Sequence, residues 1–292
     1  MDLSLQIDQV AHTDITVEEF RNNYLNQSKP LLIKGFSKDY PAGNLWTFDY
    51  FREKMGDFKV GVFDNSKKST STYVKPDLHM PFSEFLDIIQ KDEETPYRIF
   101  LFNMFKEFPE LRKEFPTPPH AKGILGELGL AFFGGKNTTV RVHFDIDCSS
   151  VLLTQFIGRK RIVLIPPDFE TLFYKLPFSG FSMVDIENPD YDKFPGLKYV
   201  QGYDFVMEPG DALFMPSRYW HYNTYLEGGM AVSYRVMANT AESVFNGVMN
   251  TSLRLVYDKM MGKVLKDKWV DRKMASSIKR AEQEIKRLTL KN

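Results

Sequence analysis

The chain has 292 residues, 43% of them hydrophobic and 14% aromatic, and its 38 basic and 38 acidic residues give a formal net charge of zero. This length is enough to bury one sizeable core, while the balanced charge excludes a strong overall field that would steer the molecule toward nucleic acid or membranes. The 25 Phe and 14 Tyr residues favour pleated, half-buried strands over a plain helical bundle.

Residue types also bear on the compartment. Cys148 is the single cysteine, so an intrachain disulfide is excluded, which fits a reducing compartment. Residues 1–14 contain acidic side chains and no apolar segment of the kind found in signal peptides. No uncharged apolar run approaches the roughly 18 residues of a membrane span. We therefore expect a soluble, cytoplasmic protein.

The N-terminal part of the chain mixes short helices and strands. Apolar spacing predicts a helix over residues 16–25, and a buried strand over residues 31–33 that ends at Gly35. An amphipathic helix is expected over residues 82–90, followed by a strand over residues 97–103.

From Ala131 onward the sequence is typical of an antiparallel β protein. The expected strands cover residues 138–144, 151–157, 160–165, 204–207, 212–215 and 230–236. Pro209 and Gly210 suit the central positions of a type II turn, because Pro presets φ and Gly accepts a positive φ. Several short strands with turns between them predict a barrel or a jelly roll.

The hydrophobic period becomes helical after Ala238. Asn239 is a good N-cap residue, and Glu242 follows three residues later as in a capping box. The apolar positions at helical spacing are Phe245, Val248, Met249, Val256, Met260 and Val264.

A last helix is expected to begin at Asp271. Its apolar seam consists of Met274, Ile278, Ala281, Ile285 and Leu288. So narrow and long a seam packs either on a helix of a second copy of the chain, giving a homodimer, or on the chain's own barrel. Lys and Arg outnumber Asp and Glu between Arg254 and Lys291, which indicates either a solvated helix face or an anionic partner.

One short motif carries the chemistry. Residues two apart on a strand point to the same face, so His143 and Asp145 send an imidazole and a carboxylate to one side. His221, after the aromatic pair Tyr219-Trp220, is the candidate third ligand. Two His and one carboxylate on one face of a metal leave open positions, as non-haem iron(II) oxygenases require. A bare His-x-Asp is also typical of a surface turn or a hydrogen-bonded pair, so its spacing alone leaves both interpretations open.

A longer set of motifs occurs in a fixed order over residues 16–237. The segments are Lys29–Gly35 (KPLLIKG), His143–Asp145 (HFD), Gln155–Arg161 (QFIGRKR), Pro166–Pro167, Val184–Asp185, Asn188–Tyr191 (NPDY), Phe194–Pro195, Glu208–Pro216 (EPGDALFMP), Tyr219–His221 (YWH) and Gly228–Gly229. This order resembles the jumonji-C (cupin-like) oxygenases, and within them the branch containing the asparaginyl hydroxylase of hypoxia-inducible factor and the tRNA wybutosine hydroxylase.

The resemblance implies a mainly β fold with flanking helices. This is a double-stranded β-helix (a jelly roll, cupin-like), with N-terminal α/β additions and C-terminal helices. It also implies Fe(II) held by His143, Asp145 and His221, with 2-oxoglutarate as co-substrate and O₂ as oxidant. We expect residues 1–237 to form the oxygenase domain and residues 238–292 a helical extension that serves dimerisation.

Four residues are candidates for the co-substrate site. Lys160 matches the lysine with which the family binds the distal carboxylate of 2-oxoglutarate, a group that is costly to bury unpaired. Thr138 or Thr139 would add a hydroxyl to the same carboxylate. Arg235 stands where relatives typically carry Asn, so it would share or take over this contact as a bidentate fork. In relatives, the region corresponding to residues 168–201 borders the substrate groove.

The function that follows is hydroxylation of a C–H bond in a protein side chain, a modified nucleoside or a small molecule. Two alternatives stay open at this point. One is a cupin-type metalloenzyme that does not use 2-oxoglutarate, and the other is a non-enzymatic binding module on a jelly-roll scaffold.

Overall fold

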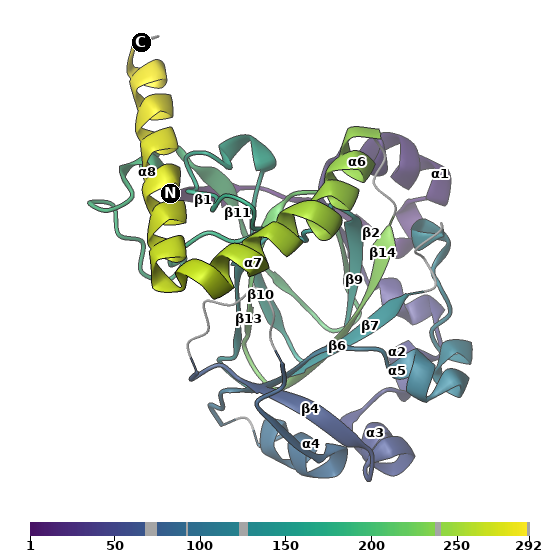
Figure 1. Ribbon diagram of the computed structural model, residues 1–292. Helices are drawn as coiled ribbons and strands as arrows, with labels where there is room; N and C mark the ends of the chain where they lie inside the picture. Colours follow the sequence, from purple (N-terminus) through teal and green to yellow (C-terminus); the bar gives the residue numbers. More distant parts are fainter. Residues whose placement is uncertain (68–74, 92, 123–127, 237–240, 291–292) are drawn as a thin grey trace.

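Two facing β-sheets form the centre of the computed structural model, which describes residues 1–67, 75–91, 93–122, 128–236 and 241–290 (Figure 1). The smaller sheet has the strand order β1-β11-β10-β13-β8, formed by Asp2–Leu5, Gln201–Met207, Lys160–Ile165, Trp220–Tyr225 and Thr139–His143. The larger sheet has the order β2-β3-β12-β9-β14-β7-β6-β4-β5, formed by Asp8–Ala11, Leu31–Lys34, Ala212–Met215, Ser150–Ile157, Gly229–Val236, Gly129–Gly134, Tyr97–Phe102, Lys59–Asp64 and Leu78–Pro81.

From β8 onward the chain passes back and forth between the two sheets, with β10 and β11 as consecutive strands of the smaller sheet. Strands β8, β10, β11 and β13 belong to the smaller sheet, whereas β9, β12 and β14 belong to the larger one, and within each sheet these strands pair antiparallel. The predicted mainly β, jelly-roll fold is confirmed.

Side-chain alternation explains why the central strands are buried along almost their whole length. On β10, Ile162 and Leu164 pack in the core between the sheets, while Val163 and Ile165 pack on the outer face beneath the C-terminal helix. A strand covered on both faces reads as a continuous apolar run rather than an alternating one. The core between the sheets is therefore flanked by a separate core on each outer side.

The N-terminal helices cover the outer face of the larger sheet (Figure 1). They are α1 to α5, formed by Val17–Phe20, Ala42–Leu45, Phe48–Met55, Phe82–Ile89 and Met104–Glu107. Thr16 caps α1 in a capping box with Glu19, and the helix continues as a π-turn over Arg21–Leu25. The predicted helices over residues 16–25 and 82–90 are thus confirmed, as is the strand over 31–33.

The three C-terminal helices run from the larger sheet across the molecule to the smaller sheet (Figure 1). They are α6, α7 and α8, formed by Ala241–Met249, Leu255–Leu265 and Asp267–Thr289, with a π-turn over Asn250–Arg254 between the first two. The last helix begins at Asp267 and not at Asp271, because the backbone leaves helical geometry only at Lys266, with φ 47°. The capping box expected at Asn239 lies outside the described residues.

The apolar seam of α8 packs on the chain's own core. Ala281 is fully buried against the outer face of the smaller sheet, and Met274, Ile278, Ile285 and Leu288 pack around it. Of the two alternatives for this seam, packing on the same chain is the one observed. By contrast, α6 and α7 leave apolar side chains exposed, among them Phe245 (62%), Val256 (60%) and Val264 (70%).

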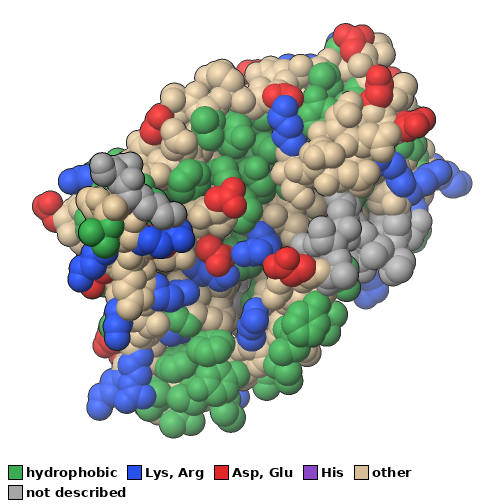
Figure 2. Space-filling model, turned by 90° about the horizontal axis from the view of Figure 1, so that it is seen from above, with side chains coloured by type: hydrophobic (Ala, Val, Ile, Leu, Met, Phe, Trp, Pro, Cys, Tyr) green, Lys and Arg blue, Asp and Glu red, His purple; other side chains and the backbone are tan. Residues whose placement is uncertain are grey.

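Surface chemistry is mixed on the face seen from above, where hydrophobic patches alternate with basic and acidic side chains (Figure 2). Within the described residues, no helix has the length and apolar character needed to cross a lipid bilayer.

Candidate metal centre

Three potential metal ligands meet on the inner side of the smaller sheet. His143 ends β8 and His221 is the second residue of β13, and the antiparallel register places them opposite each other, with imidazole centroids 4.2 Å apart. Asp145 follows β8 by two residues. Ligand atoms of His143, Asp145 and His221 all lie within 4.8 Å of one another. The structure therefore brings the three residues expected from the sequence into one cluster.

Both imidazoles are held in the form that binds a metal. Nδ1 of His143 lies 2.8 Å from the backbone oxygen of Arg141, and Nδ1 of His221 lies 3.2 Å from the backbone oxygen of Tyr219. A carbonyl only accepts, so each Nδ1 carries the proton and each Nε2 keeps a free lone pair. Burial lowers the pKa of His143 to about 3 and also lowers the pKa of His221, so both rings are neutral at pH 7.

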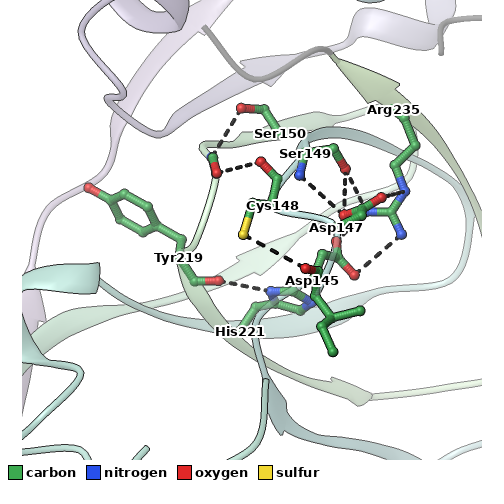
Figure 3. A network of polar contacts seen from close by, with 10 residues as sticks. Asp145, Asp147, Cys148, Ser149, Ser150, Tyr219, His221 and Arg235 are labelled. Atoms are coloured by element: carbon green, nitrogen blue, oxygen red, sulfur yellow. Dashed lines mark hydrogen bonds and ion pairs between the residues drawn. The ribbon is translucent and has the colours of Figure 1, made fainter. Parts of the chain in front are cut away.

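Asp145 is held by a guanidinium from the opposite sheet. Arg235, on β14, donates from its two terminal nitrogens to the two carboxylate oxygens of Asp145 and also donates to Ser149 Oγ at 3.3 Å (Figure 3). Its Nε lies 3.9 Å from a carboxylate oxygen of Asp147. Burial acts to raise the pKa of Asp145, but the charge and hydrogen bonds of Arg235, together with the neighbouring His221 and His143, hold the pKa below its usual value.

The cluster opens into a cavity of about 300 Å³ between the sheets. Its lining is mostly apolar and comprises Phe100, Leu101, Phe132, Val140, His143, Phe144, Asp145, Ile146, Asp147, Val151, Leu153, Lys160, Gly180, Phe181, Met215, His221, Asn223, Tyr225, Ser233 and Arg235. A concave, largely apolar cavity with a few convergent polar groups is the usual form of a small-molecule site.

Lys160 is the buried cation of this cavity. Only 2% of the residue is exposed, and its Nζ lies 4.1 Å from the ring centroid of Tyr225. Within the described part of the chain it forms no ion pair, and burial lowers its pKa to about 7. A buried ammonium without a counter-charge is costly, so an anionic ligand would stabilise it here.

The other expected co-substrate residues are placed differently. Arg235 lines the cavity, but its guanidinium is bound to Asp145 instead of being left for a ligand. Thr138 and Thr139 do not line the cavity. The hydroxyl of Thr138 donates to a backbone carbonyl in the turn before β8, at 2.7 Å, and Thr139 pairs with β13 at the far end of β8 from His143. The expected hydroxyl contact therefore does not reach the cavity.

Sequence reasoning did not single out two polar residues of the cavity, Asn223 and Tyr225. Both lie on β13 at even spacing from His221, so they share its inward face. The side-chain oxygen of Asn223 is buried and has no hydrogen-bond partner in the described structure. If residues 220–225 had been recognised as a strand, the alternation of side chains between its two faces would have placed both residues on the same face as His221.

The loop between β10 and β11 supplies one wall of the cavity. Gly180 and Phe181 line it, and Phe181 forms an isolated β-bridge with His143. The guanidinium of Arg141 lies 3.9 Å from the ring centroid of Phe181. The loop over residues 168–201, whose counterpart in relatives borders the substrate groove, therefore lies beside the metal cluster.

Two residues near the ligands have packing roles. Trp220 is fully buried and contacts Phe144 and Phe173 edge-on. The Cys148 thiol is buried, and the side-chain amide of Asn250 donates to its sulfur at 3.4 Å. Neither side chain lines the cavity.

The donor set fits a divalent transition metal with an open coordination face. Two neutral imidazoles and one ionised carboxylate are the ligands of the facial arrangement found in non-haem iron(II) sites. The cation of Lys160 and the unpaired amide oxygen of Asn223 lie in the same cavity, where they would meet a ligand bound beside such a metal.

Comparisons with known proteins agree with this site. Residues 17–236 match the family model described as a cupin-like domain. The chain is 28% identical to the lysine-specific demethylase 8 of Danio rerio over 230 residues, covering 75% of this chain and 56% of that protein. It is 28% identical to JmjC domain-containing protein D of Dictyostelium discoideum over 235 residues, covering 71% and 51%. It is 25% identical to tRNA wybutosine-synthesizing protein 5 of Danio rerio over 252 residues, covering 80% and 76%. The chain thus spans about half the length of the first two relatives.

Proposed function

The chain belongs to the family of cupin-like domains, and from this premise we propose that it is an Fe(II)- and 2-oxoglutarate-dependent oxygenase that hydroxylates a C–H bond. The observation that carries the proposal is the presence, in one cavity, of the His143–Asp145–His221 cluster and the buried, unpaired cation of Lys160. A binding module has no need of both features, and a cupin enzyme without 2-oxoglutarate has no need of the second.

In this proposal His143, Asp145 and His221 hold the iron. When bound, the metal supplies the oxidative chemistry by which O₂ and 2-oxoglutarate give succinate, CO₂ and a hydroxylated substrate. The protein holds both imidazoles as neutral Nδ1–H tautomers, keeps Asp145 ionised through Arg235, and surrounds the reacting atoms with apolar walls.

Lys160 binds the distal carboxylate of 2-oxoglutarate in this proposal. The anion would restore the counter-charge that the buried ammonium lacks. Arg235 is assigned to Asp145 rather than to the co-substrate, because its donors are already engaged there.

The substrate class is left as a protein side chain, a modified nucleoside or a small molecule. The names of the relatives include a lysine-specific demethylase and a tRNA wybutosine-synthesizing protein. Phe100, Phe132 and Phe181 give this cavity an aromatic lining, which suits a substrate with an apolar part near the reacting carbon.

The test is uncoupled turnover of 2-oxoglutarate by the iron-loaded protein. Succinate should form with matching O₂ uptake, and a His221→Ala variant should lose both the activity and stoichiometric iron while keeping its fold by circular dichroism. Iron retention without succinate would favour the cupin enzyme without 2-oxoglutarate, whereas absence of metal binding would favour a binding module.

Three further assignments belong to the same proposal. Residues 1–237 act as the oxygenase domain, and residues 238–292 act as a helical extension that forms a homodimer. The exposed apolar side chains of α6 and α7 support the dimer, since large apolar patches on soluble proteins mark interaction sites. A cytoplasmic location is supported by the free, buried thiol of Cys148.

A further inference from the structure

A second cavity, of about 290 Å³, lies beside the metal cavity. It is bounded by the segment that carries Asp145, by the loop between β10 and β11, by the π-turn before α7 and by helix α8. Phe144 and Ile146 line both cavities, so the two share a wall. Groups bound in the two cavities would therefore lie on either side of these two residues.

The lining of this second cavity is basic. Lys175, Arg254 and Arg280 contribute to it, and none of its lining residues is acidic. Lys175 pairs with Glu170 at 2.7 Å, outside the cavity lining. Figure 2 shows Lys and Arg side chains gathered around a hollow on the face seen from above, with a few acidic side chains near its rim.

The two arginines are held in place by neutral groups. Arg254 donates to the side-chain oxygen of Asn250 at 2.7 Å, and Arg280 donates to the backbone oxygen of Lys175. Within the described residues neither guanidinium has a carboxylate partner, and Nε of Arg280 is buried with no acceptor. Both side chains are thus positioned while their charges stay unneutralised.

Guanidinium groups pair best with carboxylate or phosphate, and leaving a buried donor without an acceptor is costly. The two unneutralised guanidiniums exceed the single charge of a carboxylate, whereas a phosphate offers more charge and several acceptor oxygens. One water molecule occupies about 30 Å³ in the liquid. The second cavity has about ten times this volume, which is enough for a phosphate and part of the group that it esterifies.

We propose that this second cavity binds a phosphate group of the substrate, so that the oxygenase acts on a phosphorylated molecule whose reacting carbon lies in the neighbouring metal cavity. The placement of the reacting carbon in the metal cavity rests on the proposed function, because only an oxygenase would use that cavity in this way. The binding of phosphate itself depends only on Arg254, Arg280 and Lys175.

The experiment is a calorimetric titration of the full chain, loaded with one equivalent of Mn(II) and saturated with 2-oxoglutarate, with inorganic phosphate. Arg280→Gln should weaken phosphate binding by about tenfold, as expected for loss of a charged hydrogen bond. Arg254→Gln should weaken it by about threefold, because Arg254 is more exposed. The matched control Arg272→Gln, on the exposed side of α8, should bind phosphate as the unchanged chain does.

Adenosine monophosphate and a dinucleoside phosphate then distinguish the source of the phosphate. If adenosine monophosphate binds more tightly, the substrate is a phosphate monoester, and if the dinucleoside phosphate binds more tightly, it is a phosphodiester. In both cases Arg254→Gln must weaken the binding of the compound that binds more tightly. No phosphate binding, or binding that neither variant weakens, would overturn the proposal. The 2-oxoglutarate titration on the same samples reports separately on the proposed function, since Lys160 and not the second cavity governs it. Arg254→Gln keeps the test decisive if Arg280→Gln does not fold.

Discussion

Lys160 and Arg235 are two buried cations in one cavity, yet their electrostatic situations are opposite. Arg235 is neutralised by Asp145 and supported by Asp147, and these carboxylates raise the pKa of its guanidinium despite burial. The ammonium of Lys160 lies beside the Tyr225 ring and forms no ion pair within the described residues, and burial lowers its pKa to about 7. One cation is therefore part of the protein's own structure, while the other is available to a ligand.

We predict that Arg235→Met destabilises the metal-free protein by about 3 kcal/mol, because removing one partner leaves Asp145 partly buried and uncompensated. Mn(II) should recover much of this loss, since the metal ion replaces the missing positive charge beside the carboxylate. Thermal unfolding with and without Mn(II) measures both effects. An equal loss in the two conditions, or none, would contradict the assignment of Arg235 to Asp145, and Arg235→Lys is the charge-preserving control.

The affinity for 2-oxoglutarate is predicted to fall as pH rises above about 7. Free Lys160 has a pKa of about 7, below the ordinary value of 10.5. A bound carboxylate raises that pKa, so binding takes up a proton in the window above 7 and weakens as protons become scarce. Titrations between pH 6 and about 9 should show this slope in the unchanged chain. Lys160→Arg should remove it, because guanidinium stays charged throughout.

At the residue scale, the sequence was sufficient for the ligands but not for their partners. His143, Asp145 and His221 stand in an ordered set of motifs, so their cluster could be predicted. The contact between Asp145 and Arg235 joins residues 90 positions apart on opposite sheets, and no local pattern encodes it. For the same reason, the spacing of Thr138 and Thr139 could not show that the turn before β8 turns them away from the cavity.

At the scale of elements, β13 is a strand of the site that the hydrophobic pattern did not reveal. Its outward residues Trp220 and Tyr222 are apolar or aromatic, but its inward residues His221 and Asn223 are polar because they face the site. A strand whose inner face forms a site therefore lacks the apolar alternation used to recognise strands. The strands expected over residues 138–144, 151–157, 160–165, 204–207, 212–215 and 230–236 are present as β8 to β12 and β14, whereas β7 was not predicted.

Helix α6 lies directly against the segment that carries Asp145. A Cβ atom placed on Gly247 would lie 2.1 Å from the backbone oxygen of Asp147. We predict that Gly247→Ala costs about 1–3 kcal/mol of unfolding free energy, as overpacking does, and weakens Mn(II) binding by displacing this segment.

Gly262 in α7 provides the matched control. The nearest atom to a Cβ placed there lies at 3.9 Å, which is an ordinary contact. Gly262→Ala should therefore leave Mn(II) affinity unchanged and should stabilise the helix by up to about 1 kcal/mol. Chemical unfolding and Mn(II) titration of both variants check the prediction, and equal effects would show that helix propensity rather than close approach governs Gly247.

At the scale of the whole molecule, the C-terminal helices are tied to the jelly-roll core and also present a free surface. Asn250 donates to the backbone of Ile146, and Arg280 donates to the backbone of Lys175, so the helices are tied to the segments around the metal cluster. The apolar seam of α8 packs against the core of the same chain. The sequence could show two apolar seams but not which would be covered, because that depends on where the chain turns at Lys266.

The exposed seam of α6 and α7 should then be the dimer interface. Val256 and Met260 are 60% and 54% exposed, and burying such a side chain contributes about 1.5–3 kcal/mol. We expect the full chain to sediment as a dimer at tens of micromolar, a range typical of moderate interfaces. The double variant Val256→Glu, Met260→Glu should sediment as a monomer with little change in melting temperature, because exposed side chains contribute little to the stability of the single chain. Ser276→Glu, on the exposed side of α8, adds a charge outside the seam and should leave the dimer intact. A monomeric full chain, or a dimer that survives the double variant, would contradict this assignment and leave the seam without a role in self-association.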